Sequence, residues 1–376
     1  MAEDRPLAII HVVDTLEFGG LERVVTDIAI AQRTHGHRVG VFSICATQGF
    51  RAVLEAAHID VVIGAKRGTF DLNVLRGLRR LLLKDPIDIV HTHNFVPNYY
   101  AVAATLFARR RPRVVNTCHN MGTRLANRRL RWLYRLSLAR TARIALVGCQ
   151  VHDRLVNTGI VAPARARTVL NGVAVERFAS TAESRDVARA ALDIAPDELL
   201  VGCVGRLVEL KNHRLLLTCA AGLVATWPRL RIALIGDGPL AGELRELAET
   251  LGIGGRVLFL GARDDVAELL PALDLFVLPS RTEGVSIALL EACASGLAVV
   301  ATAVGGNPEI VEDTVTGRLV ASDDAQALHA LLDELLADPA QRQRLGAAAR
   351  DWVRLNGSVD ALRRNYDQVY REALAS

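Results

Sequence analysis

The sequence lacks several short motifs by which whole classes of protein are recognised. It contains no Gly-x-x-x-x-Gly-Lys-Ser/Thr, so a P-loop nucleotide site is excluded, and Gly19-Gly20 lacks the Gly-x-Gly-x-x-Gly spacing of a dinucleotide-binding turn. No Asp-x-Asp occurs, which removes the obvious ligands for a catalytic Mg²⁺ on a diphosphate. The six cysteines include no Cys-x-x-Cys pair, so we expect them to be reduced core residues rather than disulfides.

Acidic residues are missing from one long stretch. None lies between Ile89 and His152, whereas 11 arginines lie between Arg109 and Arg143. Residues 1–180 hold 26 Lys+Arg and 13 Asp+Glu, and residues 181–376 hold 19 and 28, so the net charge of +4 is the sum of +13 and −9. A basic region of this kind attracts anions such as phospholipid, lipid diphosphate or nucleic acid. Nucleic acid is disfavoured because few aromatic residues are interleaved with the arginines.

Leader and membrane-span signals are also missing. The start, MAEDRP, is acidic rather than basic, and one long uncharged stretch, 292–308, is broken by Gly296, Gly305 and Gly306. With 376 residues, 51% hydrophobic and 23% charged, the chain is long enough for two globular domains. We therefore expect a cytoplasmic protein.

The first 175 residues alternate between short apolar runs and helical segments. Runs this short and nearly continuous are typical of parallel strands buried on both faces, which predicts a doubly wound α/β domain. In such sheets ligands bind beyond the carboxyl ends of the strands, where Gly19-Gly20, His91-Thr92-His93 and His119-Asn120 fall. The predicted strands are 7–13, 39–44, 61–63, 87–90, 114–117 and 144–147, and the predicted helices are about 21–34, 50–57, 71–84, 98–109, 124–140 and 149–157.

Two features of this domain have competing interpretations. Because His91 and His93 alternate along a strand end, we expect only one of them to face the cleft, and no neighbouring carboxylate or paired cysteine supports a zinc site. The predicted helix 124–140 is basic and amphipathic, with Trp132 among its apolar residues. It is either a packed helix with a solvated charged face or a helix that docks on an anionic membrane.

The second half has the same alternation and a pair of cations. Strands are predicted at 199–204, 232–235, 257–260, 273–278 and 297–301. Arg206 and Lys211 lie on the loop that leaves the first of these strands. Arginine can bind a diphosphate through two parallel hydrogen bonds and lysine adds a mobile point charge, so this loop is a candidate diphosphate site.

The segment 280–312 completes that site. A loop with Gly284 leads from a buried strand into a helix, so the amides of Val285, Ser286 and Ile287 lie at the positive end of the helix dipole and form an anion site. Glu283 and Glu291 bracket it, eight residues apart. Two helical glutamates often simply face water, but a nucleoside diphosphate sugar would fit between these two, with ribose and hexose hydroxyls on the carboxylates.

These motifs together resemble a known family. EGVSIALLEACASGLAVVAT, GGNPE and GRLVELKN are similar to the C-terminal signature of the retaining glycosyltransferases of family 4, also called group 1, which have the GT-B fold. The resemblance implies an α/β protein with two Rossmann-like domains facing across a cleft: an acceptor domain at 1–178, a donor domain at 179–355 and a helix at 356–376 that returns to the first domain. Gly284-Val285-Ser286 departs from the Gly-Phe-Gly or Gly-Leu-Pro of many members.

The resemblance also implies residue roles. The catalytic set would be His119, Arg206, Lys211 and Glu283, and the donor contacts would be Gly20, Arg263, Gly284, Val285, Ser286, Ile287 and Glu291, with no metal. The activity implied is metal-independent, retaining transfer of a hexose from a UDP-sugar or GDP-sugar, without a further cofactor, to a glycan or lipid-linked acceptor in bacterial surface-polysaccharide synthesis. The region Arg109–Arg143 would dock on the inner face of the membrane. A sugar-nucleotide epimerase and a non-catalytic nucleotide-sugar-binding protein are the alternatives.

Overall fold

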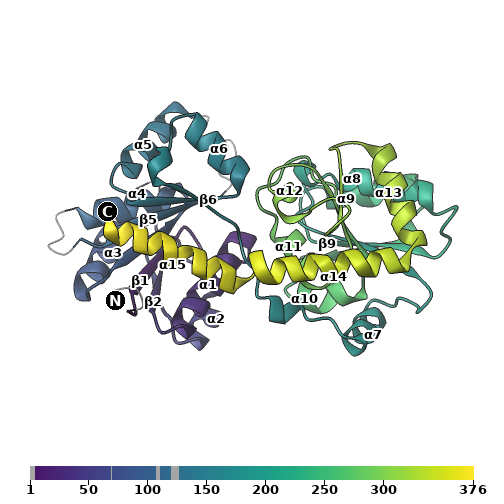
Figure 1. Cartoon of the computed structure of the whole chain (residues 1–376), viewed down its shortest axis with the longest axis horizontal. Helices are drawn as coiled ribbons and strands as arrows, with labels where there is room; N and C mark the ends of the chain where they lie inside the picture. Colours follow the sequence, from purple (N-terminus) through teal and green to yellow (C-terminus); the bar gives the residue numbers. More distant parts are fainter. Residues whose placement is uncertain (1–4, 69, 107–110, 120–126) are drawn as a thin grey trace. The chain divides into compact units, whose positions relative to one another are not determined.

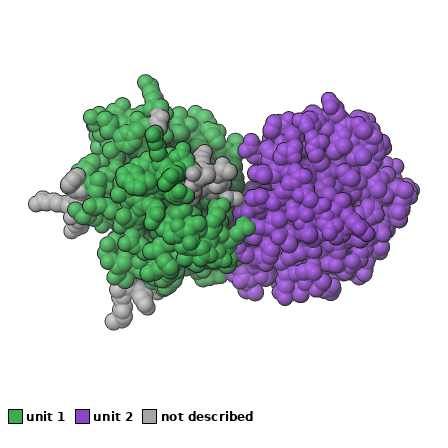
Figure 2. All heavy atoms as spheres, turned by 90° about the horizontal axis from the view of Figure 1, so that it is seen from above, with its two compact units in different colours: residues 1–172, 359–376 green, residues 173–358 purple. Residues whose placement is uncertain are grey.

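A computed structural model describes residues 5–68, 70–106, 111–119 and 127–376 of the chain (Figure 1). The chain divides into two compact units, which Figure 2 colours separately. The first unit comprises the residues up to Gly172 together with 359–376, and the second comprises 173–358. The chain therefore leaves the first unit once and returns to it for the last helix.

The first unit is built on a seven-stranded parallel sheet in the order β3-β2-β1-β4-β5-β6-β7. Its central strands are buried along their whole length, as the near-continuous apolar runs predict. The direction of strand order reverses between β1 and β4, which is the topological switch point of a doubly wound sheet. The strands are β1 Ala8–Val13, β2 Arg38–Ser43, β3 Asp60–Ile63, β4 Ile89–His93, β5 Arg113–Cys118, β6 Arg143–Val147 and β7 Ala166–Val169.

Helices cover both faces of this sheet. α1 and the last helix, α15, contact each other, and α15 (yellow in Figure 1) contacts β5, β6 and β7, whereas α3, α4 and α5 pack in a row. Val12, Phe42 and Val90 join the core that includes α3 and α4. Their neighbours His11 and His91 bond to α1 and α15 because successive side chains of a strand point to opposite faces. The helices are α1 Gly20–Thr34, α2 Arg51–Ala56, α3 Leu72–Lys84, α4 Phe95–Thr105, α5 Arg128–Leu138, α6 Cys149–Asn157 and α15 Val359–Ala375.

The second unit repeats the plan with a six-stranded parallel sheet in the order β10-β9-β8-β11-β12-β13. Its switch point lies between β8 and β11. The strands are β8 Leu199–Val204, β9 Leu230–Ile235, β10 Val257–Gly261, β11 Leu275–Leu278, β12 Val299–Thr302 and β13 Arg318–Val320, and the helices are α7 Ala182–Ala191, α8 His213–Leu223, α9 Ala241–Thr250, α10 Val266–Leu269, α11 Ile287–Ala294, α12 Asn307–Ile310, α13 Ala325–Ala337 and α14 Pro339–Asn356.

Several predicted bounds shift for local reasons. β4 continues to His93, so both histidines lie inside the strand rather than after it. α4 begins at Phe95, three residues earlier than predicted, because proline is tolerated in the first turn, where Pro97 lies. α5 begins at Arg128, and the predicted residues 124–126 lie outside the described part of the chain. α7 begins with a capping box formed by Thr181 and Ser184. No helix among the described residues is long and apolar enough to cross a membrane.

Candidate functional site

The loops that leave β8 and β11 meet at the switch point of the second sheet. β8 and β11 are hydrogen-bonded neighbours, so the segments after Val204 and Leu278 leave the same edge side by side. A hydrogen bond from the Arg281 amide to the Leu210 carbonyl, 2.8 Å long, joins the two loops directly. The fold therefore brings the predicted Arg206–Lys211 loop and the predicted Glu283 loop to one place.

Lys211 and Glu283 form the centre of this site. The Lys211 Nζ lies 2.6 Å from the Glu283 Oε1, and the Ser280 hydroxyl donates to the same oxygen at 2.6 Å. The Glu283 side chain is 8% exposed and the Lys211 side chain 23%. Burial of this kind is costly for a charge unless it is paired, so each residue holds the other in place. Among the described residues, no hydrogen bond reaches the Glu283 Oε2, which leaves this oxygen to accept from a ligand.

The helix predicted after Gly284 is α11, which begins at Ile287. Ser286 is its N-cap, with its hydroxyl oxygen accepting from the Leu289 amide at 3.4 Å. Val285 and Ser286 are buried, and Gly284 and Ile287 are half-buried. The backbone N–H groups of Ser286 and Ile287 donate to no acceptor within the described parts of the chain. They therefore present the partial positive charge of the helix N-terminus to a ligand.

Two glycines after β12 hold the backbone of the Glu283 loop in place. Gly305 has φ +58°, and a Cβ added there would lie 2.2 Å from the Glu283 carbonyl oxygen. The Gly306 amide donates to the Gly284 carbonyl at 2.8 Å. Only glycine allows this approach of two backbone segments, so the GGNPE motif acts on the position of Glu283.

The remaining predicted residues of the second unit are placed around this centre. Arg206 is exposed on the loop after β8, and Glu291 is half-buried within α11 and has a partner. Arg263 follows β10, and its guanidinium forms a bidentate pair with Asp265, Nε–Oδ1 2.7 Å. The ion pair with Asp265 engages the guanidinium that the resemblance assigns to donor binding.

Sequence reasoning missed three polar residues beside these loops. Ser280 carries the second hydrogen bond to Glu283. His213, at the start of α8, is buried with neither ring nitrogen hydrogen-bonded to a described residue, and burial together with the charge of Lys211 lowers its pKa to about 4. Asn307 donates to the Thr302 carbonyl at 2.9 Å, while its Oδ1 has no partner in the described structure. Lys211, Asn212 and Arg214 flank His213, so no local pattern indicates that it is buried.

The histidines of the first unit gather on one face of its sheet. The prediction that only one of His91 and His93 can face the site is wrong, because residues two apart on a strand share a face, and their ring centroids lie 4.3 Å apart. His11, on the neighbouring strand β1, joins them, with its Nδ1 3.1 Å from the His93 Nε2. His119 follows β5, and its Nε2 lies 3.5 Å from the His93 Nδ1.

The nitrogens of His11, His91 and His93 lie close enough together to hold a metal ion. However, all six ring nitrogens already have partners, namely Gln32, Tyr370, Thr117, His119 and one another. Burial lowers the pKa of His11 to about 4 and the pKa values of His91 and His93 well below 6.5, so the rings are neutral. The donor set is therefore satisfied as a hydrogen-bond network, and the absence of a metal stays a prediction.

Asn94 holds His119 and was also missed. It directly follows β4 with φ +67° and ψ −164°, a sparsely populated conformation for a residue with a side chain. Its Oδ1 accepts from the His119 amide at 3.0 Å, and its carbonyl accepts from the Asn116 side chain at 2.9 Å. Gly20, the other predicted residue of this unit, is exposed at the first position of α1.

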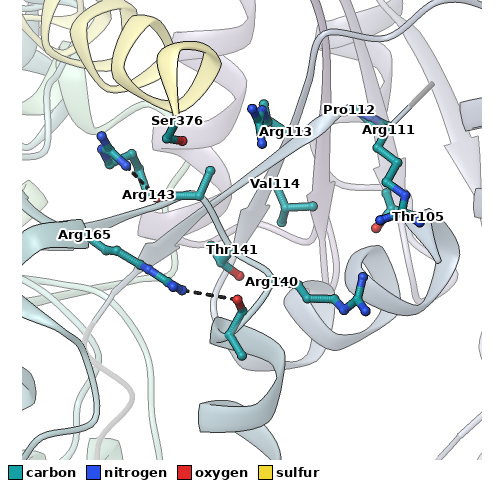
Figure 3. Close-up of a pocket in the computed structure, with 12 residues that line it drawn as sticks. Thr105, Arg111, Pro112, Arg113, Val114, Arg140, Thr141, Arg143, Arg165 and Ser376 are labelled. Atoms are coloured by element: carbon teal, nitrogen blue, oxygen red, sulfur yellow. Dashed lines mark hydrogen bonds between the residues drawn. The ribbon is translucent and has the colours of Figure 1, made fainter.

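A cavity of about 340 Å³ opens at the opposite edge of the first sheet, where β5 and β6 begin. Figure 3 shows five arginines around it: Arg111, Arg113, Arg140, Arg143 and Arg165. No carboxylate side chain lines it among the described residues, although Glu372 pairs with Arg143 at 3.1 Å. It is thus a basic hollow remote from the strand ends that carry His93 and His119.

Comparison with known proteins identifies the family. The model for glycosyl transferases group 1 matches residues 184–352, and the model for glycosyltransferase family 4 matches residues 18–177. The loops around Lys211 and Glu283 lie in the first match. The chain belongs to this family of glycosyltransferases.

Curated relatives share about a third of the aligned residues. The putative glycosyltransferase EpsF of Bacillus subtilis is 34% identical over 257 residues, 66% of this chain and 63% of EpsF. An Escherichia coli protein named UDP-Gal:alpha-D-GlcNAc-diphosphoundecaprenol alpha-1,3-galactosyltransferase is 29% identical over 262 residues, 68% of this chain and 67% of that protein. The chain spans about 39% to 67% of the length of the curated relatives it matches.

Solved structures share the fold over nearly the whole chain. Anabaena HepE in complex with UDP has a TM-score of 0.84 at 20% identity, covering 96% of this chain and 99% of HepE. This likeness confirms the predicted fold class, an α/β protein with two Rossmann-like domains of the GT-B type.

We predict that Gly305→Ala impairs transfer by displacing Glu283. The added methyl meets backbone rather than a flexible side chain, and the left-handed conformation costs about 1 kcal/mol for a residue with a Cβ. The expected result is at least a tenfold lower kcat/KM with an unchanged far-UV circular dichroism spectrum.

Gly242→Ala is the matched control, because a Cβ there meets nothing within 4 Å. Equal kcat/KM values for the two variants would show that the approach of Gly305 does not position Glu283.

Proposed function

We propose that this protein is a retaining, metal-independent glycosyltransferase that moves a hexose from a nucleoside diphosphate sugar to a glycan or lipid-linked acceptor. The observation that carries the proposal is the buried Lys211–Glu283 pair beside the start of α11, at the switch point of the second sheet. Anions bind at such helix starts, and nucleotides bind at such switch points. HepE, which has the same fold, is known in complex with UDP and with UDP-glucose.

Each residue of this site has a distinct role in the proposal. Lys211 keeps one N–H on Glu283 and has two more for the diphosphate, while the exposed Arg206 binds the diphosphate through two parallel hydrogen bonds. The α11 amides bind the same group. Glu283 accepts from hexose hydroxyls through its unused Oε2, and Glu291 accepts from the ribose hydroxyls.

The leaving diphosphate gains negative charge as the glycosidic bond breaks. Cations and helix-start amides that are already in place stabilise that charge without reorganisation. Because the sequence has no Asp-x-Asp to bind Mg²⁺, we assign this work to Arg206, Lys211 and the α11 amides. His119, directly after β5, is assigned a contact with the hexose because the family resemblance implies that role.

The acceptor proposal rests on the names of relatives and on one surface. The Escherichia coli relative is named for a diphosphoundecaprenol-linked acceptor, and a Mycolicibacterium smegmatis relative for a phosphatidylinositol mannoside. On α5 of this chain Trp132 is 63% exposed and Leu136 57% exposed, beside a hollow lined by Arg128, Arg131 and Arg135. We propose that α5 docks on an anionic membrane, where the acceptor lies. Of the predicted Arg109–Arg143 region, residues 109, 110 and 120–126 lie outside the described structure.

We expect Lys211→Ala and Glu283→Ala to abolish turnover of the nucleoside diphosphate sugar. Lys211→Ala removes a cation that binds the diphosphate, and Glu283→Ala removes a carboxylate that binds the hexose. Each substitution also leaves the other residue of the pair buried without its counter-ion, so we expect kcat to fall at least a thousandfold. Product release is measured with EDTA present. Arg354→Ala, which removes an exposed cation from α14, is the control. Near-normal turnover of either variant, or loss of wild-type turnover in EDTA, would contradict the proposal.

The donor base is identified by a thermal-shift panel of UDP, GDP and ADP with their sugars. We expect one base series to raise the melting temperature, because a ligand that binds only the folded state stabilises it in proportion to RT ln(1 + [L]/Kd). Lys211→Ala should lose most of this shift. A wild-type protein that no nucleoside diphosphate stabilises would not have the site proposed.

We expect membrane docking to depend on the arginines of α5. Replacing Arg128, Arg131 and Arg135 by serine removes about 1 kcal/mol of attraction per arginine, so affinity for phosphatidylglycerol-containing vesicles should fall on the order of a hundredfold. Replacing Arg33, Arg76 and Arg80, exposed on α1 and α3, by serine changes the net charge equally and is the control. Equal pelleting of the wild-type protein with neutral and anionic vesicles would remove the docking proposal.

A further inference from the structure

A single chain of hydrogen bonds links His119 to the C-terminal helix. From His119 it passes to His93, to His11 on β1 and to the Gln32 side chain on α1, at 3.5, 3.1 and 2.8 Å. Gln32 donates to the Tyr370 hydroxyl on α15 at 3.1 Å. The chain then returns through His91 and Thr117 to the Tyr366 hydroxyl, at 2.8, 2.7 and 2.8 Å.

Every group in this chain is buried and uncharged. His11, His91, Gln32, Thr117 and Tyr370 are 0% exposed, His93 and Tyr366 are 2% exposed and His119 is 8% exposed. Burial lowers the pKa of His119 to about 4 and raises the pKa of Tyr366 and of Tyr370, so none of them ionises near neutrality. Each imidazole therefore carries one N–H and one bare nitrogen.

Because each imidazole has one donor and one acceptor nitrogen, the donor of every hydrogen bond in the chain can be assigned, starting at Gln32. Its carbonyl oxygen can only accept, so the His11 Nε2 carries the proton and the His11 Nδ1 is bare. The His93 Nε2 must then donate to His11, which leaves the His93 Nδ1 to accept from the His119 Nε2. Three histidines are thus fixed in the same tautomer by one amide.

The other branch follows by the same reasoning. The Gln32 NH₂ group can only donate, so the Tyr370 hydroxyl accepts from it and places its own proton on the contact with the His91 Nδ1. If the His91 Nδ1 carried the proton instead, the buried Tyr370 hydroxyl proton would have no acceptor. That arrangement would cost about 1–3 kcal/mol and is excluded. The His91 Nε2 then donates to the Thr117 hydroxyl. All four histidines carry their proton on Nε2, and turning the Gln32 amide over would reverse all four together.

We propose that Gln32 and Tyr370 are positioning residues that set the tautomer of His119, so that its bare Nδ1 accepts a hydroxyl of the transferred hexose. No described residue hydrogen-bonds to the His119 Nδ1. The Asn94 side chain accepts from the His119 backbone amide and so holds the backbone of this residue in place. This inference rests on the proposed function, because the hexose contact of His119 belongs to it. The C-terminal helix thereby acts on the donor sugar through four side chains without touching it.

Histidine-selective ¹⁵N labelling tests the tautomers directly, because long-range ¹H–¹⁵N correlation spectra distinguish protonated from bare ring nitrogens. The wild-type protein should show His11, His91, His93 and His119 protonated on Nε2. One ring protonated on Nδ1, or stoichiometric zinc with metal-bound ring nitrogens, would overturn the proposal.

Tyr370→Phe tests the coupling and Tyr366→Phe is the matched control. Both tyrosines are buried on α15, one turn apart, but Tyr366 lies at the far end of the chain, beyond Thr117. Tyr370→Phe frees the Gln32 amide to turn, so the His119 ring signals should shift or double and kcat should fall about tenfold, the size that lost outer hydrogen-bond partners typically cost. Tyr366→Phe should leave the His119 signals and kcat within twofold. Gln32→Met, which keeps the length of the side chain, gives a second route should Tyr370→Phe unfold.

The outcomes separate this proposal from the proposed function. Ring changes confined to His91 in Tyr370→Phe, or an unchanged kcat despite altered His119 signals, would overturn the positioning role. The melting shift given by the nucleoside diphosphate, bound in the second unit, should be the same in both tyrosine variants. A wild-type protein without turnover of any nucleoside diphosphate sugar would instead refute the function, while leaving the ring spectra interpretable.

Discussion

The parallel direction of all paired strands is the constraint on which both units depend. Parallel strands bring every carboxyl end to one edge of a sheet, and the reversal of strand order opens that edge between β1 and β4 and between β8 and β11. Lys211 and Glu283 are 72 residues apart in sequence, yet their loops leave adjacent strands. The ion pair is thus a consequence of topology, and the buried apolar runs of the two sheets establish that topology.

In the first unit, the strands at the switch point carry a buried layer of polar side chains instead of an ion pair. One face of β1 and β4 carries histidines where the other carries Val12 and Val90. A polar layer this deeply buried is stable only when every donor has an acceptor, since an unmatched group loses its hydration without compensation. α1 and α15 supply the missing partners in Gln32 and Tyr370. The helices on this face are therefore fixed by hydrogen bonding as well as by apolar packing.

The sequence was sufficient for most strands and for the centre of the donor site. Lys211, Glu283 and the α11 start are recognisable because each is a local pattern, a charge or a glycine directly after an apolar run. β7 and β13 were not predicted, because they are short edge strands with polar residues such as Arg167 and Arg318.

The side chains that complete the sites were not predicted, because their partners are distant in sequence. Gln32 and Tyr370 are 338 residues apart, and nothing in either helix indicates the other. His11 did carry a signal, since a polar residue in the middle of the strand AIIHVV needs a buried partner. The error at His91 and His93 was one of strand geometry, which the sequence alone was enough to avoid.

The split composition of the first unit governs the order in which the chain folds during synthesis. The ribosome delivers 186 residues of the second unit, 173–358, before it delivers the helix that covers the histidine face of the first sheet. The second unit is continuous and can fold as soon as it emerges. The nascent first unit meanwhile lacks the hydroxyl that Tyr370 contributes to His91, so its polar layer is completed only once α15 has emerged after the second unit.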